Sequence, residues 1–600
     1  MRLTHTGGTH TITAEAYTLT VRDTEPTAEL SDPDGRVWSR LHLLADVDRV
    51  DAVDESYDLD AVRVSEVRDG AEDAVDVTLA VASSAWRHKT VRLRCFADRL
   101  ELRVRVEGAG TIADVRLLGG RAVLKRGACG TFRSSVNFAS VFDPTPTEPV
   151  QVVRAASAAA TLGIVGDASP GRLNGIFSPP PLCLVLGREP ARHATQVPGG
   201  DWLSLGIAAD IAATRFTQLR YQPVDGGFLL ELDYDGHTTV DGSFVSPDVV
   251  IRPAADPWQA ITAYRDDLVR RGFAPGDTPQ DRPAWWDEPI FCGWGAQCAR
   301  AAWSEAGQDG SPAAGGPDLS RQDLYDEWLA RLAEHDVVPG TVVIDDRWQA
   351  RYGTGEADPA RWPDLRAWID ARHAAGQRVL LWWKAWDPEG LPDDECVVDL
   401  AGTPVSADPG SPAYLDHLAR VVTSLIGPDG LDADGFKIDF TQRAPAGHSL
   451  RRPGAPADAP WGIAALHALL ATIHRAAKAA KPDALLVTHT PHPAFADVTD
   501  MIRLNDLLER DPAGVPVPVV DQLVFRHAVA THALPGHLVD TDQWPIGDRD
   551  AWRQYVGAQG ALGAPALYYA ERIDGSGEEL TADDLALVAE SWREYRRGRR

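Results

Sequence analysis

The sequence contains few lysines, few cysteines and no long apolar run. Its 600 residues include only six lysines, and the formal net charge of −28 argues against a nucleic acid or an anionic membrane as a partner. The six cysteines are scattered, without a CxxC pair or a Cys/His spacing that suits structural zinc. No stretch approaches the roughly 18 apolar residues of a membrane span, and the N-terminus lacks the pattern of a signal peptide. We therefore expect a globular protein in the reducing cytoplasm.

Residues 1–253 have the rhythm of β-structure. Short segments of alternating apolar and polar residues recur between turn residues, for example at 75–83, 90–108 and 228–236. Helical periodicity is nearly absent from this part, and no group of residues in it has a catalytic pattern. These features predict an N-terminal antiparallel β-sandwich domain that supports or borders a site elsewhere.

A connecting segment, 254–283, contains a predicted amphipathic helix at 256–273, followed by a stretch rich in proline and aspartate. From 284 to 600 strands and helices alternate, which is typical of a parallel sheet with crossover helices. Eight strands are expected, at 289–294, 341–346, 378–386, 435–440, 484–490, 501–506, 537–542 and 565–570. Eight such units fit a catalytic (β/α)8 TIM barrel. A doubly wound open sheet is the alternative, but no GxGxxG follows a strand.

Polar residues gather at the carboxyl ends of the predicted strands, where barrel active sites lie. Carboxylates come from four of these ends, at Asp345, Asp346, Asp439, Asp506, Asp540 and Asp542. Cleavage of a glycosidic bond requires two carboxylates, one as nucleophile or base and one as acid. A divalent metal is the competing use of such a cluster, although no HExxH spacing occurs, and no GxSxG supports a serine nucleophile.

Tryptophans lie at or beside the same strand ends, where sugar rings can pack their C–H faces on indole rings. They are Trp294, Trp348, Trp382, Trp383 and Trp386. Because neighbouring residues of a strand point to opposite faces, Trp382 and Trp383 cannot both face one site. We expect some of the five to belong to the barrel core.

Three motifs carry a family resemblance. The segments VIDDRWQ (343–349) and ADPARWPDLRAWIDARHAAGQRVLLWW (357–383) resemble the second and third barrel units of the α-glycosidases of glycoside hydrolase families 27, 36 and 31. The segment DGFKIDF (434–440) resembles their nucleophile strand, and MIRLND (501–506) resembles the strand in which an arginine precedes the acid/base. The strand count independently places Asp439 on strand four and Asp506 on strand six. The sequence departs from many family 36 members after strand five, where VTHTPHP replaces a Cys/Gly-rich loop.

The resemblance implies catalytic roles for two residues, Asp439 as nucleophile and Asp506 as acid/base. Asp497, Asp500 and Asp542 remain alternatives for the acid/base.

Substrate-binding roles are implied for residues at the other strand ends. Asp345 and Asp346 would hold sugar hydroxyls, although a helix cap is an alternative for this pair. Lys437 shares a strand face with Asp439, which allows it to bind a hydroxyl and keep the nucleophile ionised. The remaining predicted substrate-binding residues are Arg503, Trp294, Trp383, Lys384 and His489. For His489, a hydrogen-bonded rim histidine is the alternative.

The resulting hypothesis is a retaining α-glycosidase of α-galactosidase type, acting on an oligosaccharide or glycoside without a cofactor or metal. A raffinose-synthase-like transglycosidase and an α-glucosidase or α-xylosidase specificity are alternatives. A catalytically silent carbohydrate-binding protein is the alternative outside enzymes. Whether the chain forms a homo-oligomer is left open.

Overall fold

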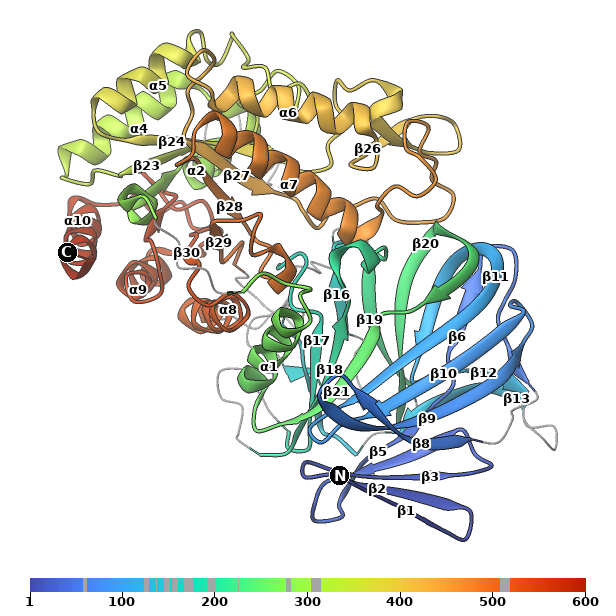
Figure 1. The fold of residues 1–600 in the computed structure, drawn as a ribbon. Coiled ribbons are helices and arrows are strands. Elements are labelled where there is room, and N and C mark those ends of the chain that lie inside the picture. Colours follow the sequence, from blue (N-terminus) through green and yellow to red (C-terminus); the bar gives the residue numbers. More distant parts are fainter. Residues whose placement is uncertain are drawn as a thin grey trace.

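The computed structural model describes residues 1–57, 62–123, 129–135, 137–144, 152–153, 160–166, 176–190, 200–224, 226–276, 282–303, 315–507 and 518–599. Along the chain, an antiparallel β part is followed by a ring of parallel strands surrounded by helices (Figure 1). Residues 277–281 of the predicted linker lie outside the described residues.

The chain begins with a five-stranded antiparallel sheet in which each strand pairs with the next. Its strands are β1 (Arg2–Thr6), β2 (Thr9–Thr13), β3 (Thr18–Arg22), β4 (Thr27–Ser31) and β5 (Val37–His42). The two-residue alternation places Leu19 and Val21 of β3 in the core, while Thr18 and Thr20 are half-buried. Strand β1 is an edge strand, and nearly all of its residues are exposed.

A sixteen-stranded sheet makes up the rest of the described β part. Its strands are β6 (Asp46–Arg49), β7 (Ser56–Tyr57), β8 (Arg63–Asp69), β9 (Glu72–Ser83), β10 (His88–Cys95), β11 (Leu100–Leu117), β12 (Gly119–Val123), β13 (Cys129–Ser135), β14 (Ser140–Phe142), β15 (Val152–Val153), β16 (Ala160–Gly163), β17 (Cys183–Gly187), β18 (Trp202–Ala208), β19 (Gln218–Val224), β20 (Gly227–Val245) and β21 (Asp248–Ala254). Except for the parallel β7–β12 pair, its neighbouring strands are antiparallel. The antiparallel β architecture is therefore confirmed, while its division into the two layers of a sandwich stays a prediction.

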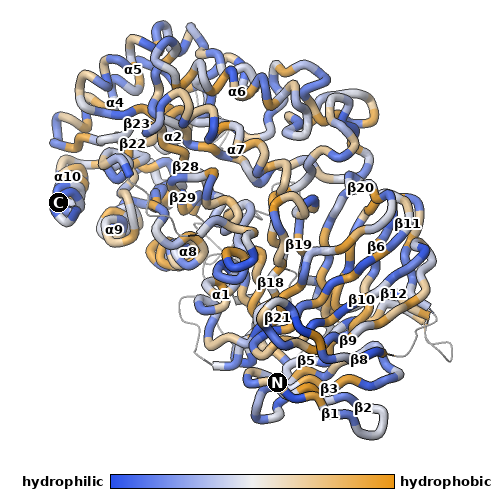
Figure 2. The backbone as a smooth tube through the Cα atoms, viewed as in Figure 1, coloured by the Kyte–Doolittle hydropathy of each residue, from blue (hydrophilic) through white to orange (hydrophobic). Residues whose placement is uncertain are grey.

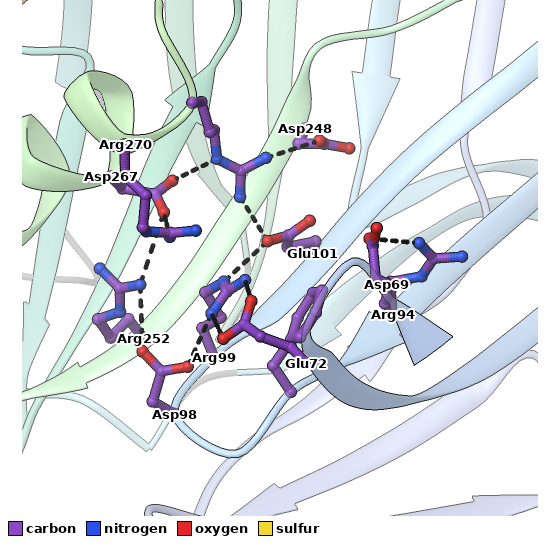
Figure 3. A network of polar contacts seen from close by, with 12 residues as sticks. Asp69, Glu72, Arg94, Asp98, Arg99, Glu101, Asp248, Arg252, Asp267 and Arg270 are labelled. Atoms are coloured by element: carbon purple, nitrogen blue, oxygen red, sulfur yellow. Dashed lines mark hydrogen bonds and ion pairs between the residues drawn. The ribbon is translucent and has the colours of Figure 1, made fainter. Parts of the chain in front are cut away.

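Helix α1 (Pro257–Arg270) forms the connection. It begins where the Asp256 carboxylate accepts the backbone N–H of Gln259, with Pro257 at the first helical position. An ion-pair network fastens the end of α1 to the β part (Figure 3). Asp267 pairs with Arg271 at 2.7 Å, and Arg271 also pairs with Glu101 of β11. Because Asp267 and Glu101 are buried, leaving either unpaired would be costly, so the network fixes α1 against the sheet.

The barrel contains eight parallel strands in sequential order. They are β22 (Ile290–Cys292), β23 (Thr341–Ile344), β24 (Arg378–Lys384), β27 (Gly435–Asp439), β28 (Leu485–Thr488), β29 (Met501–Arg503), β30 (Leu538–Asp540) and β31 (Ala566–Leu567). Strand β31 pairs with β22, and a parallel bridge between Asp540 and Ala564 joins the last two strands. Each strand lies within one of the eight predicted segments, so the strand count is confirmed.

Helices surround these strands. They are α2 (Trp294–Ala302), α4 (Gln322–Glu334), α5 (Leu365–Ala374), α6 (Pro412–Ile426), α7 (Gly462–Ala480), α8 (Val519–Ala533), α9 (Arg549–Gln559) and α10 (Ala582–Arg599). The connection between β28 and β29 holds only the 3-10 turn η6 (Pro493–Phe495), and a hairpin of β25 (Cys396–Val398) and β26 (Pro404–Ala407) precedes α6. Figure 2 shows hydrophobic residues on the inner strands and hydrophilic ones at the end of α10. Within the described chain, no helix has the length and apolar character that a bilayer crossing would need.

The β part borders the carboxyl end of the barrel. Val165 bridges to Arg443, shortly after β27, and the Gly166 N–H donates to the Gln442 carbonyl at 2.8 Å. Further along, the Ser178 N–H donates to the His489 carbonyl at 2.9 Å, and the Asn505 amide donates to the Ile176 carbonyl. We propose the domain division 1–253, 254–283 and 284–600, with the first domain completing the rim of the barrel.

Candidate active site

Asp439 is the last residue of β27, at the carboxyl edge of the barrel. The strand begins at Gly435 with a φ of 149°, and a Cβ there would collide with the Leu485 carbonyl of β28. This glycine therefore lets β27 approach β28 closely enough to pair with it. The Asp439 carboxylate accepts the Phe440 N–H at 2.8 Å and the Trp382 indole N–H at 3.2 Å.

A single guanidinium joins three carboxylates. Arg503, which ends β29 and is 1% exposed, donates from Nη2 to Asp439 at 2.7 Å and from Nη1 to Asp542 at 2.7 Å. The same Nη1 lies 3.5 Å from Asp506. Strands four, six and seven thus bring Asp439, Asp506 and Asp542 around one buried cation.

The environment separates the pKa values of Asp439 and Asp506. Burial opposes ionisation of Asp439, but the charge of Arg503 and its hydrogen bonds outweigh burial and hold the pKa of Asp439 well below its usual range. Desolvation raises the pKa of Asp506 to about 7, and the negative charges of Asp542 and Asp439 add to this rise. The positive charge of Arg503 acts in the opposite direction. The Asp506 side chain is nevertheless 49% exposed, so it can exchange a proton with solvent. One carboxylate is therefore ionised and the other protonated below pH 7, which is the division of labour that an acid-assisted displacement needs.

His489 is a buried, neutral contact of the same guanidinium. Its Nδ1 lies 3.1 Å from Arg503 Nη2, and its Nε2 lies 2.6 Å from the Thr441 hydroxyl. Burial and the nearby Arg503 charge lower the pKa of His489 to about 3. Because Arg503 can only donate, we assign the ring proton to Nε2, which donates to Thr441; Thr441 in turn donates to the Ser178 carbonyl at 3.0 Å.

Asp345 and Asp346 have different partners. Asp345 is buried and accepts a 2.8 Å hydrogen bond from the Lys437 ammonium and a 3.0 Å contact from the Cys292 thiol. Asp346 accepts from the Tyr352 hydroxyl at 2.6 Å, and burial raises the pKa of Asp346 to about 6. Neither carboxylate caps a helix, since no described helix begins at this pair.

Lys437 and Lys384 are both engaged by other side chains. The Lys437 ammonium is paired with Asp345 rather than Asp439, and it lies 5.0 Å from the Tyr568 ring centroid. Lys384 pairs with Asp387 at 2.7 Å and lies 4.2 Å from the centre of the Tyr352 ring. The predicted influence of Lys437 on Asp439 is thus electrostatic, without a direct contact.

The two adjacent tryptophans of β24 do face opposite ways. Trp382 donates to Asp439, whereas Trp383 packs edge-on against Phe436 at 5.8 Å, away from the carboxylates. Of the two, the structure therefore brings Trp382 into the cluster rather than the predicted Trp383. Trp294 lies at the start of α2, where its ring packs edge-on against that of Trp544 at 5.7 Å.

The alternative acids Asp497 and Asp500 lie elsewhere. Asp500 precedes β29 and accepts from the Lys478 ammonium and the Leu486 N–H, on the amino-terminal side of the strands. Asp497 is 57% exposed and lies 3.6 Å from His467. Asp542 is fully buried and bound by Arg503, without the solvent contact that Asp506 has. Among the predicted candidates, Asp506 alone combines proximity to Arg503 with access to solvent.

Several members of the cluster were missed at the sequence level. They are Thr441, Ser178, Tyr352, Cys292 and Tyr568. Tyr568 sits after β31, beyond a strand end, and this position was its only signal. Ser178 comes from the β part, and nothing in its sequence surroundings points to the barrel.

No family model matches this sequence, and no curated protein matches it. Solved structures do share its fold. A GH31 family sulfoquinovosidase from E. rectale, in complex with an aza-sugar inhibitor, aligns with a TM-score of 0.57 at 10% identity, over 99% of this chain and 83% of that one. A GH36 α-galactosidase from Geobacillus stearothermophilus aligns with a TM-score of 0.52 at 12% identity, over 100% of this chain and 86% of that one. An α-galactosidase from Lactobacillus brevis aligns with a TM-score of 0.52 at 10% identity, over 98% of this chain and 83% of that one.

The chain therefore has the fold of multidomain glycosidases in families GH36 and GH31, as the three motifs indicated. At these identities the similarity establishes the fold and leaves the activity to be argued from the site.

Proposed function

We propose that this protein is a retaining α-glycosidase in which Asp439 is the nucleophile and Asp506 the acid/base. The observation that carries the proposal is the shared guanidinium of Arg503, which lies between the two carboxylates. Their pKa values are displaced in opposite directions, that of Asp439 downward and that of Asp506 upward to about 7. Such a displaced pair supports an assignment of base and acid.

The reaction proceeds by double displacement. Asp439 attacks the anomeric carbon while Asp506 transfers its proton to the leaving oxygen, and a glycosyl–enzyme ester forms. Asp506, now ionised, removes a proton from water, which attacks the same carbon and releases Asp439. Two inversions give net retention. Arg503 and the Trp382 indole hold the attacking carboxylate, and neutral His489 restrains the guanidinium.

The proposed substrate is a terminal α-galactoside. Asp345, Asp346 and Lys437 lie at neighbouring strand ends, where they would serve as hydroxyl partners, and two of the fold relatives are described as α-galactosidases. A hydroxyl that bridges Asp346 and Lys384 would find an acceptor and a donor, both in contact with Tyr352.

Hydrolysis of a panel of 4-nitrophenyl glycosides, each as both anomers, tests this function. We expect turnover of α-glycosides, highest for α-galactoside, with the α-anomer of the sugar as first product by ¹H NMR. A first product of β configuration would exclude the retaining mechanism. Turnover only with a sugar acceptor would favour a transglycosidase, and sugar binding without turnover would favour a silent binding protein.

A further inference from the structure

Two histidines and one aspartate meet on the five-stranded sheet at the N-terminus. His5 of β1 and His10 of β2 are register partners across their hairpin, and their rings stack with centroids 4.1 Å apart at 10°. Asp23 follows β3, and its N–H donates to the Gly8 carbonyl at 3.0 Å. Its carboxylate faces both imidazoles, with Oδ1 2.8 Å from His10 Nε2 and Oδ2 3.4 Å from His5 Nε2. Strands β1 and β2 and the residue after β3 thus each direct one side chain to a common point.

These separations are those of ligands around one metal ion. Zinc binds imidazole nitrogen and carboxylate oxygen at about 2.0–2.2 Å, so neighbouring ligand atoms lie about 3.0–3.4 Å apart in octahedral or tetrahedral shells. The ligand atoms of the three side chains all lie within 4.8 Å of one another. Although Asp23 Oδ1 is 2.8 Å from His10 Nε2, it makes no hydrogen bond. Asp23 Oδ1 and His10 Nε2 are therefore close without being aligned as a hydrogen bond. This geometry suits two atoms that coordinate the same metal ion.

The charges distinguish this cluster from two others with similar spacing. Among the described residues, ligand atoms also converge in Asp370, His373 and Asp432, and in Asp114, Glu231 and Asp233. Those two groups already hold cations, because Lys481 pairs with Asp432 and Arg220 pairs with Asp233. In the part of the chain that the structure describes, the ion pairs of Asp23 are with the imidazoles of His5 and His10, and no lysine or arginine ammonium or guanidinium pairs with it.

We propose that His5, His10 and Asp23 bind one divalent transition-metal ion of the zinc or nickel class. Two imidazoles and one carboxylate suit these ions better than magnesium or calcium, which prefer oxygen ligands. The exposed His5 side chain, 52% accessible, leaves room for water in the remaining coordination positions. The ion would link the exposed edge strand β1 to β2 and to the end of β3, closing a hairpin whose turn consists of Gly7 and Gly8. Its role is to stabilise the sheet edge, independently of the glycosidase activity.

Isothermal titration of the full-length, untagged protein with zinc chloride, after removal of metals by a chelator at pH 7.5, tests the site. We expect the unaltered protein to bind one zinc ion per chain at this site. In His10→Gln and in Asp23→Asn this binding should be lost or weakened more than tenfold. His88→Gln is the matched control, since His88 is an exposed histidine on β10 outside the cluster, and it should bind like the unaltered protein. Equal zinc titrations of Asp23→Asn and the unaltered protein, or no zinc binding by the latter, would overturn the proposal.

Thermal unfolding gives a second readout that does not depend on activity. Zinc should raise the first unfolding temperature of the unaltered protein and of His88→Gln, because a ligand that binds the folded state stabilises it. It should leave the unfolding temperature of Asp23→Asn unchanged. With chelator present, all variants should unfold at the same temperature as the unaltered protein. This result would exclude a folding defect as the cause of lost zinc binding. An equal zinc-induced rise in Asp23→Asn contradicts the proposed site.

Discussion

Arg503 donates a 2.7 Å hydrogen bond to Asp439 through one nitrogen of its guanidinium, while the other nitrogen lies 3.5 Å from Asp506. The cation stabilises the ionised form of both carboxylates, but Asp439 receives the shorter contact and further donors. This inequality is what keeps one carboxylate charged while the other retains its proton.

Replacing Arg503 by methionine should therefore move both limbs of the pH–rate profile to higher pH. Loss of the positive charge raises the pKa of Asp439, which must be ionised, and that of Asp506, which must be protonated. We expect kcat/KM for a 4-nitrophenyl substrate to fall about 10²–10³-fold, as for the loss of one electrostatic donor. An acid limb that stays in place would show that Arg503 does not control the ionisation of the nucleophile.

The acid role of Asp506 predicts that the pH–rate profile has a basic limb near neutral pH. Because burial raises the pKa of Asp506 to about 7, kcat/KM should decline as the pH rises above about 7, where the carboxyl loses the proton that it must donate. In Asp506→Asn this limb should disappear, and turnover of substrates with poor leaving groups should fall about 10²–10⁴-fold. Activated aryl glycosides should lose less. Equal loss on both kinds of substrate would contradict general acid catalysis by this residue.

The chain of contacts from Ser178 through Thr441 to His489 predicts a positioning effect. In Thr441→Val the Nε2 proton of His489 loses its acceptor, which frees the ring to flip and to stop accepting from Arg503. We expect kcat to fall about tenfold or more with an altered acid limb, and Thr441→Ser to restore both. Thr472→Val on α7, another buried threonine, is the control for general destabilisation. If Thr441→Val only lowers the melting temperature, the contact is structural.

The Lys437–Asp345 pair predicts a stability effect. Both side chains are nearly fully buried, so Lys437→Met leaves an uncompensated carboxylate and should cost about 3–5 kcal/mol. In the double variant with Asp345→Asn, much of this loss should be recovered. Thermal unfolding of the four proteins measures the coupling. Additive losses in melting temperature would indicate that the two side chains do not stabilise each other in the folded protein.

The barrel could be predicted from the sequence because each strand is a short apolar run followed by polar residues. This pattern lies within each segment, so it can be recognised without knowing which strands are neighbours in the fold. The same locality places Asp439 and Asp506 at strand ends. Alternation predicts that Trp382 and Trp383 diverge, but which of them faces the site depends on how β24 is turned relative to β27, a tertiary property.

Contacts between distant segments could not be predicted in this way. The spacing of Lys437 and Asp439 predicts a shared face, yet the Lys437 ammonium pairs with Asp345 at 2.8 Å, a residue of another strand end. Likewise, Thr441 and Ser178 are separated by 263 positions. Their contact follows from the packing of the β part on the barrel rim, for which the sequence carries no local pattern.

The covalent role of Asp439 is the central claim, and chemical rescue of Asp439→Ala tests it most directly. The variant should have no measurable activity on an activated aryl α-glycoside. Added azide should restore turnover, because the small anion fits the space left by the carboxylate and attacks the anomeric carbon from the same face. The account predicts a β-glycosyl azide as the product by NMR. Activity that survives the substitution without azide, or an α-glycosyl azide, would contradict it.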